Sequence, residues 1–158
     1  MKHSIKTGLS FGLTSAVITT LGLMVGLNSG THSRTVVLGG ILTIAIADAL
    51  SDSLGIHISE ESEGKHTHKQ IWTSTLTTFL TKFSISMSFI LPVLFLSLTD
   101  AVFTSLIWGF SLLILFSYYI GRGEKIETWK VILEHVSIGL IVVLITHYTG
   151  MWISSVLV

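Results

Sequence analysis

The sequence predicts an all-α membrane protein with five transmembrane helices in a single domain, residues 1–158. Charged residues make up only 11% of the chain, whereas soluble domains carry about 25%. The mean hydropathy is +0.77. Stretches without Asp, Glu, Lys or Arg recur along the chain, and a helix needs about 20 apolar residues to cross a bilayer. These stretches are residues 7–33, 83–99, 101–121 and 135–158.

The first predicted span, residues 5–27, is rich in glycine. Its apolar run is longer than the roughly 7–15 residues of a signal-peptide core and lacks a typical cleavage site, so we expect it to be retained. Gly8 and Gly12 are spaced as in small-residue motifs that let helices approach closely in lipid. They are therefore predicted to lie at a helix–helix contact, either as ordinary packing or as the seam of a helix pair or dimer.

The second span, residues 35–58, carries two carboxylates in an otherwise apolar run. An ionised carboxylate near the bilayer centre costs about 2.5–3.5 kcal/mol on insertion scales. Asp48 and Asp52 are about one helical turn apart and share a face. A chain tolerates such a face where it lines a polar pathway or meets a cation. The pair therefore predicts a site for an ion.

The third span, residues 71–98, carries a lysine at a matching depth. At about 1.5 Å of rise per residue, Lys82 and Asp48 both lie some 16 Å from the inner boundary. We therefore expect Lys82 to pair with the two aspartates. The alternative to an ion site is a salt bridge that only lets polar residues insert, although one lysine cannot neutralise two carboxylates. Pro92 is expected to kink or end this helix near its outer end.

Residues 59–70 are predicted to form a polar loop between the second and third spans. Carboxylates and imidazoles together suit a borderline divalent cation such as Fe²⁺, Mn²⁺ or Zn²⁺. Their spacing matches no closed structural site, so a solvated loop is the alternative to a loop that collects metal. The candidate ligands are Glu60, Glu61, Glu63, His66 and His68.

The fourth and fifth spans are predicted over residues 101–120 and 129–151. The fourth contains no charged residue. Glu134 lies about one and a half turns inside the start of the fifth. It is a candidate to gather a cation at the inner mouth, or else a shallow carboxylate that reaches interfacial water.

Lysine and arginine predict the orientation of the spans, because cytoplasmic loops carry an excess of both. When successive ends of the five spans are assigned alternately to the two sides of the membrane, seven of these residues fall on the first side and only Arg34 on the second. The N-terminus is therefore expected in the cytoplasm. The residues on the first side are Lys2, Lys6, Lys65, Lys69, Arg122, Lys125 and Lys130.

The residues described so far resemble the vacuolar iron transporter family, whose members are five-span antiporters of divalent metals and protons that work as homodimers. Residues 8–15 read GLSFGLTS, where the family typically shows GxNDGLxS. Residues 47–59 read ADALSDSLGIHIS, where many members have AD(A/G)xSMxxG(E/N)YxS. Leu91-Pro92 falls where the third span usually has proline, and residues 148–150 resemble a recurrent ending of the last span.

The departures from the family pattern bear on the same sites. Phe11 stands where the family has a metal-binding aspartate, and Ile56 replaces a carboxylate or amide. Asp52 takes the place of a methionine, and its harder oxygen would favour Mn²⁺, Fe²⁺ or Mg²⁺ over softer ions. The long cytoplasmic insert of the plant members is absent. Of the two aspartates in this motif, Asp48 alone matches the family pattern, and the resemblance implies that it lines the polar pathway.

The leading hypothesis is therefore export of Fe²⁺ or Mn²⁺ from the cytoplasm by a homodimer in a lipid bilayer, with protons as the counter-ion. Asp48 and Asp52 would bind the cation, and Lys82 would compete for them. The alternatives are a non-transporting scaffold or regulatory subunit with the same fold, which Phe11 favours, and a transporter of another ion. No catalytic constellation or phosphate loop indicates an enzyme. No resident cofactor or nucleic-acid partner is expected, and the host membrane stays open.

Overall fold

The computed structural model describes residues 2–123 and 127–157, and these residues are helical apart from short turns. Lys125 therefore lies outside the described residues. Five helical stretches in the described part are long and apolar enough to cross a membrane, which confirms the predicted all-α fold and the number of candidate spans. Each stretch begins before and ends after the predicted bounds, except the third, which ends earlier. The stretches are His3–Thr31, Arg34–Glu63, His68–Phe95, Leu98–Arg122 and Thr128–Val156.

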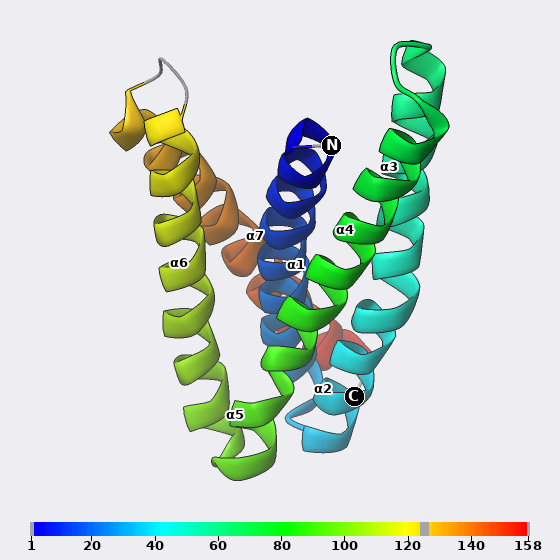
Figure 1. The fold of residues 1–158 in the computed structure, drawn as a ribbon. Coiled ribbons are helices and arrows are strands. Elements are labelled where there is room, and N and C mark those ends of the chain that lie inside the picture. Colours follow the sequence, from blue (N-terminus) through cyan, green and yellow to red (C-terminus); the bar gives the residue numbers. More distant parts are fainter. Residues whose placement is uncertain (1, 124–126, 158) are drawn as a thin grey trace.

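The second and third spans are each built from more than one helical element. The elements are α1 (Lys2–Thr31), α2 (Arg34–Thr43), the π-helix η1 (Ile44–Asp48), α3 (Ala49–Glu63), α4 (His68–Ser88), α5 (Ile90–Phe95), α6 (Leu98–Gly123) and α7 (Thr128–Leu157). The N-terminus lies at the same end of the bundle as the α3–α4 turn and the start of α7, and the C-terminus lies at the other end (Figure 1). We call these the inner and outer ends.

Helix α1 lies at the centre of the bundle and packs against α2, α4, α6 and α7 (Figure 1). Its glycines explain how so many helices reach it. A Cβ atom on Gly8 would lie 2.7 Å from Ser74 O, and one on Gly12 would lie 2.9 Å from Thr78 O. Towards the outer end, a Cβ atom on Gly26 would lie 3.3 Å from Thr146 O of α7. Because α4 covers Gly8 and Gly12, they form a helix pair within one chain, and the alternative of a dimer seam there is wrong.

The turn between the second and third spans is much shorter than predicted. Helix α3 continues to Glu63 and ends at Gly64, whose φ of +62° is left-handed and therefore favours glycine. Helix α4 starts at once with a capping box, in which Thr67 and Gln70 satisfy each other's backbone N–H groups. The prediction of a loop over residues 59–70 is therefore wrong, because its first five residues are the last turn of α3 and its last three begin α4.

The third span is interrupted close to its outer end, as Pro92 predicts. Helix α4 ends at Ser88, four residues before Pro92, and α5 resumes after Phe89. The proline ring cannot coexist with a regular helical carbonyl four residues earlier. The carbonyls at the end of α5 are then capped from α2, since Arg34 donates to Leu96 O at 2.6 Å.

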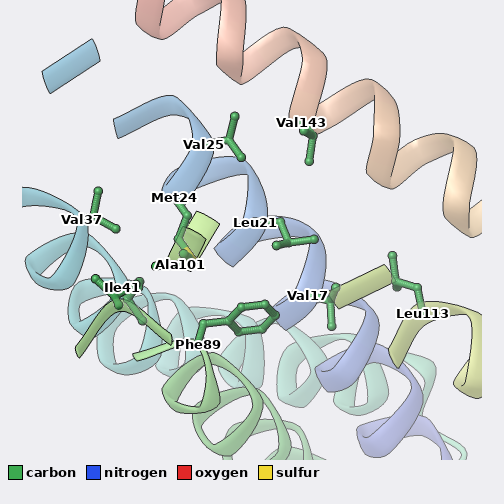
Figure 2. Close-up of a cluster of buried hydrophobic side chains, with 11 residues drawn as sticks. Val17, Leu21, Met24, Val25, Val37, Ile41, Phe89, Ala101, Leu113 and Val143 are labelled. Atoms are coloured by element: carbon green, nitrogen blue, oxygen red, sulfur yellow. The ribbon is translucent and has the colours of Figure 1, made fainter. Parts of the chain in front are cut away.

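The apolar core lies in the outer half of the bundle. Figure 2 shows side chains of α1 meeting those of the surrounding helices in this half. The cluster comprises Val17, Leu21, Met24, Val25, Val37, Ile41, Phe89, Val93, Ala101, Leu113 and Val143. The contact between α1 and α4 in the inner half is instead made by glycines and hydroxyl side chains. The boundary between these two halves is where the charged residues of the spans meet.

Candidate cation site

Four polar side chains meet near the middle of three spans, and we call them the central polar cluster. They are Ser15 on α1, Asp48 at the end of η1, Asp52 on α3 and Lys82 on α4. Ser15, Asp48 and Lys82 each lie close to the midpoint of the span that carries them. At about 1.5 Å of rise per residue, a span of this length places its midpoint near the centre of a bilayer about 30 Å thick.

Lys82 is the hub of the central polar cluster. Its side chain is 0% exposed. Its ammonium group forms ion pairs with Asp52 Oδ2 and with Asp48 Oδ2, the latter at 2.6 Å. It also donates to Ser15 Oγ at 2.8 Å, and Ser15 donates in turn to Asp52 Oδ2 at 2.6 Å. The structure thus brings Lys82 against both aspartates, as its depth in the sequence predicts, and adds a hydroxyl that joins two of the charges.

Asp48 is bound less completely than Asp52. Its Oδ2 atom is within ion-pair distance of Lys82, but the angles do not meet those of a hydrogen bond, and no other described residue bonds it. Asp52 Oδ2 receives hydrogen bonds from both Lys82 and Ser15. Asp48 is therefore the carboxylate with coordination capacity to spare.

The π-helical turn η1 ends at Asp48, between the apolar and the charged parts of the second span. Ala49 N donates to Ile44 O, five residues back. A π-turn holds one residue more than an α-turn, so the helix that follows is rotated by about 100° from its regular course. Val37 and Ile41 of α2 lie in the apolar core, while Asp48 at the end of η1 and Asp52 of α3 lie against Lys82. Such turns occur frequently at functional sites.

The charges of the central polar cluster do not cancel. With all three groups ionised, one ammonium faces two carboxylates. The Asp48 and Asp52 side chains are 33% and 23% exposed, whereas Lys82 is fully enclosed. A partly exposed carboxylate in the middle of a bilayer must meet water, a proton or a cation, because hydrocarbon does not solvate charge. The excess negative charge lies on the accessible side of the cluster, which is the side a cation would approach.

A line of buried hydroxyls continues from Lys82 along α4. Ser74, Thr78 and Ser86 are each 0% exposed and recur at helical spacing on the side of α4 that carries Lys82. Beyond Lys82 towards the outer end, Thr20 of α1 donates to Ser86 Oγ at 3.0 Å. Each of the other two hydroxyls also bonds its own helix backbone, as isolated helix hydroxyls commonly do. The α1–α4 contact is polar along much of its length.

Glu60 is a third carboxylate on the side of α3 that packs against α4. It is only 5% exposed, and its Oε2 atom lies 2.5 Å from Ser74 Oγ. The sequence predicts Glu60 as a member of an exposed loop, which is wrong because α3 extends past it and folds it against α4. It lies between the inner end of the bundle and Asp52.

The other predicted ligands remain separate from the central polar cluster. Glu63 pairs with His66 at 3.6 Å, and the His66 ring stacks on His3 of α1. Glu61 and His68 are exposed at the helix ends beside the turn. Glu134 is exposed on α7, which packs on α1 and α6. Among the described residues, no three His, Cys, Asp or Glu side chains gather in a metal-binding arrangement.

Two features of the site are missed by sequence reasoning. Ser15 is not predicted as a site residue, although it follows Gly8 and Gly12 on the face of α1 that turns to α4. A small or hydroxyl residue recurring at helical spacing on that face is the signal that could have found it. The burial of Glu60 depends on the exact end of α3, which is decided by the cap at Gly64.

Searches with protein-family models and among curated proteins found no match to this chain. The resemblance to the vacuolar iron transporters therefore rests on the quoted residues alone.

Proposed function

We propose that the protein is a multi-pass membrane transporter that exchanges a divalent cation for protons at the central polar cluster. The observation that carries the proposal is the placement of Lys82. A fully buried ammonium group occupies the space between two carboxylates near the middle of the membrane. A position that already holds one cation has the electrostatics to hold another.

In this mechanism Lys82 acts as an internal substitute for the transported ion. The carboxylates of Asp48 and Asp52, with Ser15 Oγ, would bind the incoming cation once the ammonium group withdraws. Carboxylate and hydroxyl oxygens suit hard cations, which keep bound water when the protein supplies few ligands. This donor set supports Mn²⁺ or Fe²⁺ as the transported ion.

The charges of the central polar cluster would also couple proton binding to cation binding. Enclosure in a low-dielectric site favours the neutral form of a carboxyl group, and a bound cation favours the ionised form. Entry of the cation would expel protons from the pair, and its release would readmit them. Glu60 lies on the inner side of Asp52, where it would pass ions or protons between the inner end and the cluster. Glu61, Glu63, His66 and His68 lie at the inner end, and Glu134 lies on α7. These groups would attract cations to the inner mouth.

The proposal includes an N-terminus in the cytoplasm and two copies of the chain working together. Basic residues at the inner end support this orientation. A second copy is supported by the partial exposure of Asp48 and Asp52, because a partner covering α3 would shield these side chains from lipid. The direction of transport is outward from the cytoplasm.

Flux through proteoliposomes tests the proposed function. Purified protein should carry Mn²⁺ into or out of vesicles and move protons in the opposite direction. The double variant Asp48→Asn with Asp52→Asn should abolish both fluxes, because neutral amides cannot hold the cation. Glu127→Gln is the control, since it removes an exposed carboxylate that pairs with Lys130 outside the cluster and should leave most of the flux. Metal flux that survives the double substitution would rule out the mechanism.

A structural clasp is the second candidate function for the same residues. It is favoured by the ion pairs themselves, which satisfy Lys82 without any metal, and by the apolar Phe11. In a non-transporting scaffold, Mn²⁺ would not raise the melting temperature. A charge exchange, Asp52→Lys with Lys82→Asp, would restore the stability lost in either single variant. A transporter should instead be stabilised by Mn²⁺ through binding to the folded state, and Asp52→Asn should remove that stabilisation.

A further inference from the structure

A groove between the inner ends of α1 and α6 has a chemistry that the central polar cluster does not use. Its volume is about 650 Å³, and it is lined by the early turns of α1 and the last turns of α6. None of its lining residues belongs to the central polar cluster. The volume falls within the range of about 300–1,000 Å³ that is common for small-molecule sites.

The described lining of the groove carries positive charge and no carboxylate. Lys6 contributes an ammonium group from α1, and Arg122 contributes a guanidinium group from α6. The Arg122 Cζ atom lies 5.3 Å from the centre of the Tyr118 ring. A guanidinium group stacked in this way keeps its N–H donors in its own plane, where they can form a fork around phosphate oxygens. Tyr119 adds a second phenol to the same end of α6.

Apart from Ser10, the remaining lining of the groove is apolar, and part of it lies deeper in the bundle. Leu9 is one turn further along α1 than Lys6, and Phe116 precedes Arg122 on α6 by more than one turn. Leu9 is 42% exposed, so its side chain is available to a ligand. The groove is therefore charged at the level of the bilayer headgroups and apolar at the level of the acyl chains. Tyrosine at the boundary between the two is usual for a membrane interface.

We propose that this groove binds one anionic phospholipid of the inner leaflet. Its phosphate lies between Lys6 and Arg122, and an acyl chain covers Leu9 and Phe116. Charge complementarity selects an anionic headgroup over a zwitterionic one, and basic pockets between membrane helices on the cytoplasmic side bind such headgroups. The apolar depth of the groove selects a lipid over free phosphate. Because α1 also carries Ser15, the lipid braces the helix that holds one side of the central polar cluster.

Native mass spectrometry of the purified protein with added phosphatidylglycerol or phosphatidylcholine of the same chain length tests the site. The wild type should retain phosphatidylglycerol at about ten-fold lower concentration than phosphatidylcholine, as one charge-assisted contact can confer. Arg122→Gln should remove that preference, and Arg122→Lys should keep part of it. Lys130→Gln is the matched control. Lys130 is an exposed cation at the inner end that pairs with Glu127 and does not line the groove.

Three further measurements distinguish binding of the whole lipid from binding of its headgroup alone and from a folding defect. Glycerol phosphate at the same concentration should not displace phosphatidylglycerol, and Leu9→Asn should weaken its retention without changing any charge. Circular dichroism melting should show that the variants are folded. Equal retention by the wild type and Arg122→Gln would overturn the proposal, as would equal loss in Lys130→Gln or displacement by glycerol phosphate. All of these outcomes are independent of whether the protein transports a cation.

Discussion

Lys82 is the single residue on which the most contacts of the site depend. Removing one partner of a buried ion pair costs about 3–5 kcal/mol, because the remaining charges lose their compensation. In Lys82→Ala, Asp48 and Asp52 would face each other without a cation. We expect the variant to be less stable by about 3 kcal/mol in metal-free solution, near the lower end because both carboxylates are partly exposed.

Added Mn²⁺ should restore the stability of Lys82→Ala, since the metal supplies the missing positive charge. The variant should also bind Mn²⁺ more tightly than the wild type and transport it more slowly, because release loses its competing ammonium group. Thermal melting with and without Mn²⁺, together with flux, measures these effects. Lys130→Ala is the control, because its exposed pair with Glu127 contributes about 1 kcal/mol or less. A metal-free Lys82→Ala protein as stable as the wild type would contradict the account.

At the scale of helices, the contact between α1 and α4 is the one that holds the site together. It brings Ser15 to Lys82, and it depends on the absence of side chains at Gly8 and Gly12. Gly8→Ala would place its Cβ atom 2.7 Å from Ser74 O, so α4 must move away. We expect a loss of about 1–3 kcal/mol from this overpacking, and a weaker response of the melting temperature to Mn²⁺.

Gly55→Ala is the matched test of this close approach. It also replaces a helical glycine, but its Cβ atom would meet nothing within 4 Å. Because alanine is the better helix former, we expect Gly55→Ala to be neutral or to stabilise the protein by up to about 1 kcal/mol. Melting curves of the two variants in the same detergent measure the difference. Equal melting temperatures would show that α1 and α4 are not tightly packed at Gly8.

At the scale of the whole molecule, the orientation in the membrane decides which end of the bundle supplies the cation. The chain has no cysteine, so a single introduced cysteine can be labelled without background. Lys65 in the α3–α4 turn and Thr99 at the start of α6 are both exposed, and these two segments lie at opposite ends of the bundle (Figure 1). An impermeant maleimide added to intact cells should label Thr99→Cys and not Lys65→Cys, because the inner end carries most of the basic residues.

Permeabilised cells provide the control for this experiment, since both cysteines should then react. Labelling of Lys65→Cys alone in intact cells would reverse the predicted orientation. The same result would move the lipid groove to the opposite leaflet, because it is lined by the start of α1 and the end of α6. These helix ends lie at the same end of the bundle as the α3–α4 turn that carries Lys65 (Figure 1).

The sequence by itself determined the number of spans and the depth of the charges within them. Hydropathy and the constant rise of a helix are local properties, so counting residues is sufficient to place Asp48 level with Lys82. The end of α4 near Pro92 is predictable for the same reason, because the ring acts on the carbonyl of its own helix.

Only the tertiary structure decided which faces meet. It assigned Gly8 and Gly12 to α4, brought Ser15 to Lys82, and buried Glu60 against Ser74. The π-turn η1 rotates the helix that follows it. Hydropathy does not reveal this rotation, because a π-turn and an α-turn can have the same composition. Contacts between helices depend on the shapes of both helices. In lipid these contacts are driven by close packing, so no hydrophobic pattern along one helix shows which face meets its neighbour.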